Sequence, residues 1–430
     1  MYAETTMVLA IMTAAFFLSS WKFKSPEIAL LITAVAGAVA GGLGFPARLL
    51  VEGTFTYFDV GLIFLTASIF INFYSETGAM NALVRKMVDR FYARKWVLFT
   101  ILTVIMLIPG ALTGAGSVSM FVVGGMVATV LRFMGICDKK TVAFIYITSM
   151  LAAVAPPINL WVMMMAAQAN MPYVGFELPL IAPVVLISAF SIAYLLRGGT
   201  PDPKAKILAE LPLPPAGMNT FRIVTPLLVF IVLIIAAKYA AFAVPTLGIP
   251  LIFMICALLS VAMDPEKKGF RRWYAVLNRT MEQVFPLLAT VICVGVLVNI
   301  MAATGVRGLI AITFVTLPVY LIFASALVVL PLAQATLSYS SAIIIGAPLI
   351  FLFNSIGVNV TIVAAALSFI YPLGDSLPPA RVSGRVAIDV TGFQGSYMSF
   401  MREIWVPSLF MGLVGLGMLI FANKLTWLIV

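Results

Sequence analysis

The chain contains no histidine among its 430 residues. Histidine is the commonest acid–base catalyst near neutral pH and a principal zinc ligand. Its absence excludes an HExxH metal site and any histidine-dependent catalysis. Motifs of aspartyl and serine intramembrane proteases are missing as well. The sequence therefore predicts that the protein is not an enzyme.

Cysteine and charged residues are also scarce. Three cysteines, Cys137, Cys256 and Cys293, lie in or beside apolar segments without a pairing pattern, which excludes a disulfide framework and suggests inert small residues. Charged residues make up only 10% of the chain, and the longest polar stretch is a Pro-rich linker from Arg197 to Arg222. No soluble domain is predicted.

Long apolar segments make up most of the chain. Hydrophobic residues account for 63% of it, the mean hydropathy is +1.12, and spans of about 20 apolar residues recur throughout. The first, Met7–Trp21, lacks a basic start and an A-x-A exit, so a retained span is expected. The net charge of +10 comes from basic residues in short loops, which indicates membrane topology rather than nucleic-acid binding. The composition predicts an all-α polytopic protein embedded in a lipid bilayer.

Two neighbouring apolar segments are interrupted near their middles. The first contains a Gly/Ser/Thr-rich knot from Gly110 to Ser119, and the second contains Pro156-Pro157. A Pro-Pro pair breaks a helix because proline lacks a backbone donor and clashes with the preceding turn. In lipid, such breaks persist only where protein buries them or where they line a cavity. The pattern predicts a re-entrant hairpin followed by a broken helix.

The same pattern occurs twice in the chain. A single shift along the sequence, without a gap, takes Pro109 to Pro331 and Pro156-Pro157 to Pro378-Pro379. Other matches at the same or a slightly larger shift include Ser119 with Ser341, Gly124 with Gly346, Gly135 with Gly357, Asn72 with Asn299, and Phe176 with Phe400. Matches at helix-breaking residues are matches in backbone shape. They predict an internal duplication, as in many secondary transporters.

Two segments with alternating basic and apolar residues, Ala79–Lys95 and Asp264–Arg279, are predicted to be amphipathic interfacial helices. The predicted division of the chain is scaffold spans with the first interfacial helix (1–95), the first hairpin and broken helix (96–170), scaffold spans with the linker and second interfacial helix (171–282), a scaffold span (283–308), the second hairpin and broken helix (309–390), and a C-terminal span (391–430).

Positive-inside statistics place the basic segments 85–95 and 267–279 in the cytoplasm. A re-entrant first hairpin then starts and ends on that side, and the linker is cytoplasmic too. No charged residue occurs from Gly308 to Gly374, around the second hairpin. The two hairpins thus have the opposite charge surroundings that an inverted repeat requires. Both termini are expected on the periplasmic or extracellular side.

Oxygen-bearing groups cluster at the two knots and the two breaks. Unwound backbone, hydroxyls, amides and carboxylates are the ligands that Na⁺ prefers. The predicted cation ligands are Thr113, Gly114, Ser117, Ala155, Pro156, Asn159, Thr336, Ser338, Gly374, Asp375 and Ser376. The predicted substrate ligands are Asn159, Ser340 and Arg381. A hydrogen bond back to its own helix is the alternative for any single Ser or Thr. No transition metal or organic cofactor is predicted.

Charges inside the second broken helix have several interpretations. Asp375 and Arg381 are the only charged residues in this stretch before Arg385, and a charged residue inside the membrane suggests a functional role. Arg381 could bind a substrate carboxylate bidentately, pair with Asp375 as a structural lock, or mark a helix end at the cytoplasmic side. Asn72 and Asn299 are interpreted as polar contacts between helices.

These motifs resemble a known family. P-G-A-L-T-G-A-G-S at Pro109–Ser117, A-P-P-I-N at Ala155–Asn159 and L-P-P-A-R at Leu377–Arg381 are similar to the large membrane subunit of TRAP transporters (tripartite ATP-independent periplasmic transporters). The wider superfamily includes the divalent anion/sodium symporters. The family usually has a Ser-rich knot, I-P-P-S and T-P-P-V-G, and these departures bear on the substrate more than on the fold.

The resemblance implies an elevator-type importer in a bacterial or archaeal cytoplasmic (inner) membrane. A mobile domain of both hairpins and both broken helices would move against a scaffold of outer spans. A sodium gradient would drive uptake of a small organic acid delivered by a periplasmic substrate-binding protein, and a separate small four-helix membrane subunit would brace the scaffold.

Two other functions are weighed against this one. A stand-alone anion symporter, coupled to sodium or protons, would need no partner, and co-purification of a small membrane protein would separate the two. A structural subunit of a larger complex is the more distant alternative. Such a subunit would carry charged relay residues in several spans, and here they are nearly absent.

Overall fold

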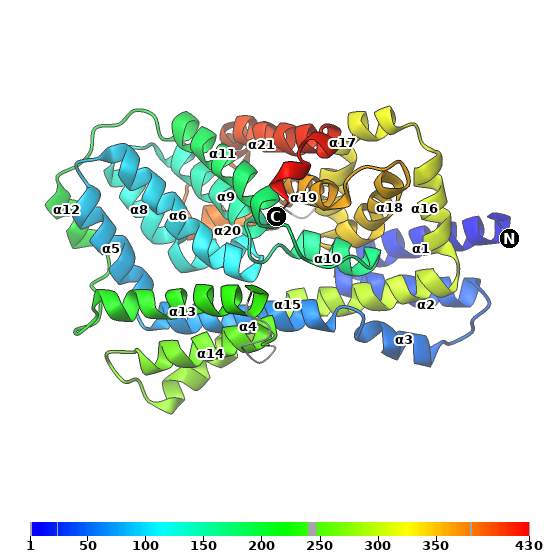
Figure 1. The fold of residues 1–430 in the computed structure, drawn as a ribbon, viewed down its shortest axis with the longest axis horizontal. Helices are drawn as coiled ribbons and strands as arrows, with labels where there is room; N and C mark the ends of the chain where they lie inside the picture. The colour runs from blue at the N-terminus through cyan, green and yellow to red at the C-terminus, as the bar shows by residue number, and fades with distance from the viewer. Residues whose placement is uncertain (1, 24, 240–246, 379–380, 430) are drawn as a thin grey trace.

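The computed structural model describes residues 2–23, 25–239, 247–378 and 381–429 and shows a helical membrane protein (Figure 1). Within these residues, nine helices are long and apolar enough to cross a membrane. The predicted all-α polytopic fold with two hairpins and two broken helices is confirmed. Pro379 and Ala380, part of the predicted second break, lie outside the described residues.

The first half of the chain begins with two helices that pack on each other and ends at the linker. Its helices are α1 (Tyr2–Phe23), α2 (Pro26–Ala40), α3 (Ala47–Thr54), α4 (Phe58–Glu76), α5 (Ala79–Phe91), α6 (Lys95–Thr113), α7 (Gly116–Ser119), the π-helical η1 (Met120–Gly124), α8 (Gly125–Phe133), α9 (Asp138–Val154), α10 (Leu160–Ala169), α11 (Glu177–Leu195) and, in the linker, α12 (Lys204–Glu210).

The second half repeats this order. Its helices are α13 (Thr220–Tyr239), α14 (Ile249–Ala262), α15 (Phe270–Ala303), α16 (Val306–Thr316), α17 (Val319–Leu337), the π-helical η2 (Ala342–Gly346), α18 (Ala347–Ser355), α19 (Val360–Ile370), the 3₁₀-helical η3 (Tyr371–Ser376), α20 (Val382–Thr391), α21 (Tyr397–Ile420), and the short 3₁₀ turns η4 (Ala422–Lys424) and η5 (Thr426–Leu428).

The internal repeat is visible in the helix bounds. The shift that takes Pro109 to Pro331 also places α9 and α10 on 360–376 and 382–391, which are the bounds of α19 with η3 and of α20. Even the π-helical turns correspond, since the same shift takes η1 onto η2. A π turn inserts one residue into a helix and is typical of functional sites. The two halves thus share irregularities as well as regular helices.

Packing follows the same repeat. Helix α4 packs on α14 while its counterpart α15 packs on α2. Helix α10 packs on α18, and α20 packs on α8. Helices α9 and α19 each contact both α11 and α21. Each broken helix therefore packs against the hairpin of the other half.

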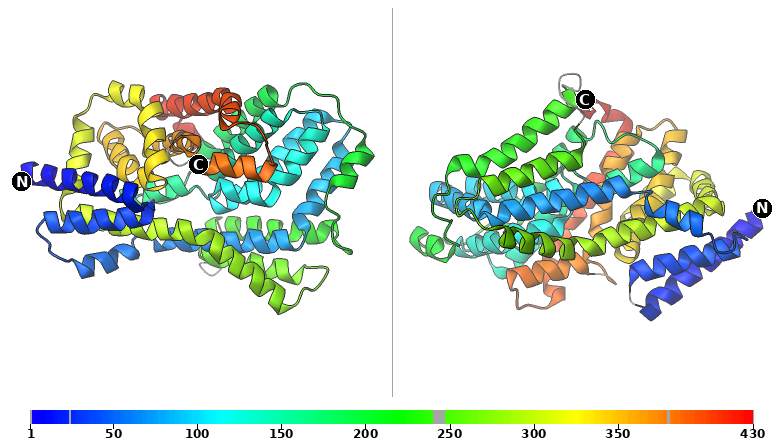
Figure 2. Two further views of the ribbon diagram at one scale, coloured as in Figure 1. Left: turned by 180° about the vertical axis from the view of Figure 1, so that it is seen from behind. Right: turned by 90° about the horizontal axis from the view of Figure 1, so that it is seen from below.

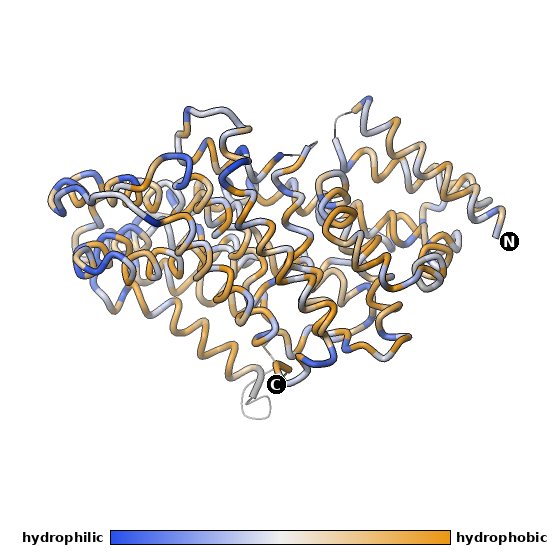
Figure 3. Tube along the Cα trace, turned by 90° about the horizontal axis from the view of Figure 1, so that it is seen from above, coloured by the Kyte–Doolittle hydropathy of each residue, from blue (hydrophilic) through white to orange (hydrophobic). Residues whose placement is uncertain are grey.

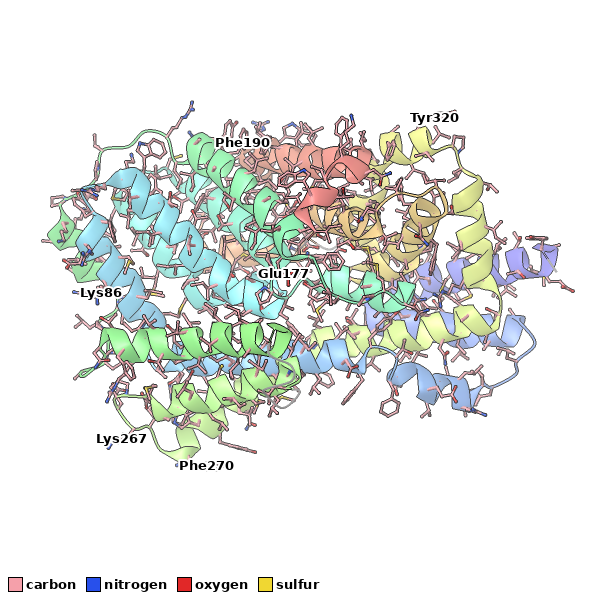
Figure 4. The ribbon with its side chains drawn as sticks, viewed as in Figure 1. Lys86, Glu177, Phe190, Lys267, Phe270 and Tyr320 are labelled. Atoms are coloured by element: carbon pink, nitrogen blue, oxygen red, sulfur yellow. The ribbon has the colours of Figure 1, made fainter. Side chains whose placement is uncertain are left out.

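Polar segments of the chain gather at one end of the molecule. Lys86 on α5 and Lys267 before α15 lie at one end, and Tyr320 at the start of α17 lies toward the other (Figure 4). Figure 3 shows hydrophilic segments gathered at one end and largely hydrophobic helices between. Helices α1 and α2 lie side by side away from α5 and α12 in all views (Figures 1 and 2). The two predicted basic segments therefore share one end.

Two predicted boundaries were wrong. Asp264–Arg279 is not a separate interfacial helix followed by a span starting at residue 283, because α15 runs uninterrupted for 34 residues. No glycine occurs between Gly269 and Gly295 to end the helix, and Pro286 is accommodated within it. The repeat of α5 is α16, which was predicted to begin the second hairpin at residue 309; that hairpin begins with α17 at Val319.

Candidate transport site

Both hairpin tips and the second break line one cavity of about 390 Å³. The scaffold helices α2, α4 and α15 form its other wall. The lining side chains that carry polar atoms are Glu27, Ser68, Asn72, Ser117, Gln283, Thr290, Gln334, Thr336, Ser338, Tyr339, Asp375 and Ser383. Segments from both halves of the chain thus meet at a single site, between α2, α4 and α15 on one side and the hairpins and second break on the other.

The first hairpin turns at Gly114, whose φ of +71° favours glycine. A Cβ there would lie 2.6 Å from Leu160 Cγ, so the turn packs directly on α10. Thr113 Oγ1 donates to the carbonyl of Pro109 at 2.8 Å, which is the local bond considered as the alternative to a cation ligand. Ser117 lines the cavity. Of the three residues predicted here, Ser117 is the one that faces the site.

The polar side chain at the first break bonds to the backbone beside it and to the second half of the chain. Asn159 caps α10 by accepting from Val162 N at 3.1 Å and donates from Nδ2 to the carbonyl of Val154 at 3.0 Å. Its Nδ2 also donates to Ser368 Oγ on α19 at 3.0 Å. Ala155, Pro156 and Asn159 are absent from the cavity lining within the described residues. Asn159 therefore connects the two halves rather than facing the cavity.

The second hairpin tip projects more polar groups into the cavity. Thr336 and Ser338 both line it. Thr336 Oγ1 also donates to the carbonyl of Leu332 at 3.0 Å, whereas Ser338 has φ +53°, a backbone conformation that is unusual for a residue other than glycine. Ser340 is buried outside the cavity lining, and its Oγ has no hydrogen-bond partner in the described part of the chain.

The second break presents a carboxylate to the cavity. Asp375 Oδ1 accepts from Gln334 Nε2 at 2.9 Å, and Oδ2 accepts from Ser383 Oγ at 3.4 Å. Gln334 Oε1 in turn accepts from Trp161 Nε1 at 3.1 Å and from Ser341 Oγ at 2.9 Å. Gln334 thus joins the second hairpin, the second break and the first broken helix in one network.

Two neighbours of Asp375 fix the backbone of this break. A Cβ on Gly374 would lie 2.1 Å from the carbonyl oxygen of Pro331, so only glycine lets η3 approach α17 this closely. The Ser376 side chain is buried, and its carbonyl accepts from Tyr397 OH at 2.6 Å. Both residues therefore position Asp375, and neither belongs to the described lining of the cavity.

The structure places Arg381 away from the cavity. The residue precedes α20 as its N-cap with φ +53°, and its guanidinium lies over the ring of Tyr397 at 5.2 Å. Among the described residues no ion pair joins it to Asp375, and it does not line the cavity. Its position agrees with the helix-end interpretation, and the substrate-binding and lock interpretations have no contact to support them here.

Several residues that line the cavity were not predicted from the sequence. Gln334 is an amide within a largely apolar helix one turn before Ser338, and this was the available signal. Glu27 follows Ser25-Pro26 like an ordinary helix-start acid, yet its Oε1 accepts from Thr290 Oγ1 on α15 at 2.9 Å in the cavity wall. Nothing in the sequence distinguishes such a carboxylate from a capping residue.

Asn72 and Asn299 contact neighbouring helices as predicted. Asn72 Nδ2 donates to Thr280 Oγ1 at 3.0 Å and to Gln283 Oε1 at 3.1 Å, and Asn299 Nδ2 donates to the carbonyl of Leu49 at 2.7 Å. Asn72 and Gln283 also line the cavity. The scaffold wall is therefore polar in its own right.

Comparisons with known proteins bear on the fold. No family model matches the chain, and no curated protein matches it. Among solved structures it is similar to the YdaH transporter of Alcanivorax borkumensis, with 14% identity over 86% of this chain and 87% of that one and a TM-score of 0.63. It is also similar to MtrF of Neisseria gonorrhoeae, described with a class of antimetabolite efflux pumps, with 11% identity over 87% and 83% and a TM-score of 0.62.

The chain has the fold of a polytopic membrane transporter. Each match covers most of the solved chain and most of this one. At 11% and 14% identity the likeness is one of fold, and the TRAP resemblance rests on the sequence motifs.

Proposed function

We propose that the protein is a secondary active transporter that carries a small organic acid together with Na⁺ by an elevator movement. The observation that carries the proposal is the convergence of two hairpin tips and a broken helix on one cavity that contains Asp375. The moving body would be α6–α10 and α17–α20, and the stationary scaffold would be α1–α4 and α13–α15. Irregular backbone between half-helices is how many secondary transporters bind ions and solutes.

The cavity offers ligands suited to a hard cation. Asp375 provides a carboxylate with one short and one long hydrogen bond, and Ser117 and Ser338 line the same space. Hard cations prefer oxygen ligands of this kind. Na⁺, transported as a co-substrate, would occupy the region between Asp375 and the two hairpin tips. The hydrogen bonds that Gln334 and Ser383 donate would keep the carboxylate of Asp375 oriented in this region.

The charge of the cavity supports coupling to a cation. Its described lining includes two carboxylates, Glu27 and Asp375, and neither lysine nor arginine. At an effective dielectric constant near 20, like charges roughly 4 Å apart repel by about 4 kcal/mol. An organic anion would therefore bind poorly until cations neutralise these carboxylates. Binding of Na⁺ before the anion couples the two fluxes.

Partners would cover the exposed apolar sides of the scaffold. Helices α1 and α13 expose large apolar side chains, including Phe17, Leu18, Phe221, Leu228 and Ile231. The small four-helix subunit would pack on this surface beside lipid, and a periplasmic binding protein would deliver substrate in the inner membrane of a bacterium or archaeon. A stand-alone symporter is the second candidate. Purification from its native membrane separates the two, because only the first retains a small membrane protein.

Uptake by reconstituted protein tests the function. Proteoliposomes would be given labelled succinate, citrate or benzoate with an inward sodium gradient, with equal sodium on both sides, or with potassium in its place. We expect concentrative uptake of at least one acid with the gradient only, abolished by a sodium ionophore. Uptake that is the same in all three conditions would refute sodium coupling, and protein-free liposomes are the control.

A further inference from the structure

A second cavity continues from the main one toward the end that carries Lys86 and Lys267. It has a volume of about 260 Å³ and shares Asn72, Phe121, Val122 and Gln283 with the main cavity. Residues near the end of α4 and the start of α15 line the rest of it. Under the proposed function this end faces the cytoplasm, so the second cavity lies on the path between the site and the cell interior.

One face of α15 supplies most of this lining. Arg272, Val276, Arg279 and Gln283 are spaced three or four residues apart, which places them on the same side of a helix. Further along the same face, Leu287 and Thr290 line the main cavity. The long uninterrupted α15 thus carries a row of side chains from Arg272 at its polar end to the central site.

Two donor groups in this row have no partner among the described residues. Arg272 Nε pairs with Glu76 Oε1 at 2.7 Å, whereas the Arg279 guanidinium forms no hydrogen bond or ion pair within 2–23, 25–239, 247–378 and 381–429. Gln283 Oε1 accepts from Asn72 Nδ2 at 3.1 Å, which leaves the Gln283 NH₂ group without an acceptor in the described part of the chain. Arg279 and Gln283 are four residues apart, so both donor groups face one space.

The two cavities differ in charge. The main cavity has Glu27 and Asp375 as its only charged lining residues among those described, whereas the second has Arg272 and Arg279 against Glu76. An anion is therefore attracted to the second cavity without any cation. A guanidinium binds a carboxylate with two parallel hydrogen bonds, and an amide NH₂ adds a third.

We propose that Arg279 and Gln283 form a carboxylate subsite on the scaffold, separate from the cation site at Asp375. The inference rests on the proposed function and names the residues that hold the organic acid at the cytoplasmic end of its path. The subsite binds the carboxylate in the absence of Na⁺, and the central cavity binds it only with Na⁺.

Calorimetric titration of the full-length protein in detergent tests the subsite. Succinate, citrate and benzoate would each be titrated in sodium-free choline buffer against wild type, Arg279→Gln and Gln283→Leu. Arg271→Gln is the matched control, because it removes the same charge from α15 at an exposed position outside both cavities. We expect saturable binding of at least one acid to wild type and the control, weakened at least tenfold by Arg279→Gln and severalfold by Gln283→Leu.

Two results would overturn the subsite. One is sodium-free affinity that is equal in Arg279→Gln and Arg271→Gln, and the other is the absence of sodium-free binding by wild type for all three acids. Uptake measured on the same preparations keeps the two proposals apart. Sodium-driven uptake with unchanged sodium-free binding in Arg279→Gln refutes the subsite only. Arg279-dependent binding without sodium-driven uptake of any acid refutes the transport proposal.

Discussion

The side-chain amide of Gln334 donates to the carboxylate of Asp375 over 2.9 Å and so ties the second hairpin to the second break. The same amide accepts from Trp161 on the first broken helix, which makes it a link between the two repeats. Asn159 at the first break donates to Ser368 on α19 and forms another such link, between the two broken helices. These bonds hold the second hairpin and the two broken helices together, as the proposed moving body requires.

Replacing Gln334 tests this network. Gln334→Leu leaves the buried Trp161 N–H without an acceptor, which costs about 1–3 kcal/mol, and removes the short bond to Asp375, which keeps only its longer bond from Ser383. The Ser341 hydroxyl keeps its bond to the carbonyl of Ser338. We expect a lower midpoint of thermal unfolding in detergent and a higher sodium concentration for half-maximal uptake. Trp161→Phe removes one of the three bonds and should have the smaller effect. Equal midpoints for both variants and wild type would contradict the network.

Asp375 should control sodium dependence. Asp375→Asn keeps the shape of the side chain but removes the charge that would attract Na⁺. We expect sodium-driven uptake to fall at least tenfold while the protein still folds, as judged by its gel-filtration profile and unfolding midpoint. Asp389→Asn, an exposed position on α20 outside the cavity lining, is the matched control and should retain uptake. Sodium-stimulated uptake by Asp375→Asn at the wild-type level would exclude Asp375 as a cation ligand.

The irregular backbone of the fold could be predicted because its causes are local. Proline removes a donor and glycine admits positive φ wherever they occur, so the positions of the knots and breaks follow from Gly114, Pro156 and Pro378. Their repetition at a constant spacing then indicated the duplicated halves. The end of the second basic helix could not be found in this way, because a basic amphipathic pattern looks alike in an interfacial helix and at the end of a long one such as α15.

Side-chain directions at the site depend on tertiary packing. Arg381 and Asp375 are six residues apart and bear opposite charges, yet one lies over Tyr397 and the other faces Gln334. The half-helix after them begins at a turn whose geometry the residue types do not specify. Gln334 in turn is one amide among apolar residues, and such an amide equally suits a contact between helices. Only the approach of α17 to η3 makes it part of the site.

The close crossing of α3 and α15 should require glycine at Gly53 and Gly295. A Cβ on Gly295 would lie 2.3 Å from the carbonyl oxygen of Gly53, so α15 and α3 touch by their backbones. Gly295→Ala forces the helices apart, and such overpacking typically costs about 1–3 kcal/mol. We expect a lower unfolding midpoint in detergent.

Gly417→Ala is the comparison for that variant. Gly417 lies within α21, and a methyl group added there would have no described atom of a neighbouring segment within 4 Å, so alanine should raise helix stability by up to about 1 kcal/mol. The two variants carry the same chemical change inside a helix and should shift the midpoint in opposite directions. A Gly295→Ala midpoint at or above that of wild type would show that the crossing tolerates a side chain.

A set of polar contacts joins α10 to α16 and to Tyr57 at the start of α4. Arg307 Nη2 on α16 donates to the carbonyl of Gln168 on α10 at 2.8 Å, and the Gln168 side-chain amide lies 2.7 Å from Tyr57 OH. The cavity that Gln168 and Arg307 line together with apolar side chains has a volume of only about 10 Å³. Because α10 belongs to the body that would move and Tyr57 to the scaffold, an elevator movement must break this contact.

Removing the guanidinium should therefore shift the resting conformation. Labels at Glu52 on α3 and Asn170 after α10, in a background with the exposed Cys137 replaced by serine, would report the separation of scaffold and moving body by pulsed electron spin resonance. We expect one narrow distance distribution in the parent and an added longer population in Arg307→Ala, because a two-state equilibrium follows the difference in contacts between its states. Arg402→Ala, which removes an exposed charge from α21, should leave the distribution unchanged. An identical distribution in Arg307→Ala would mean that the contact between Arg307 and Gln168 does not set the resting conformation.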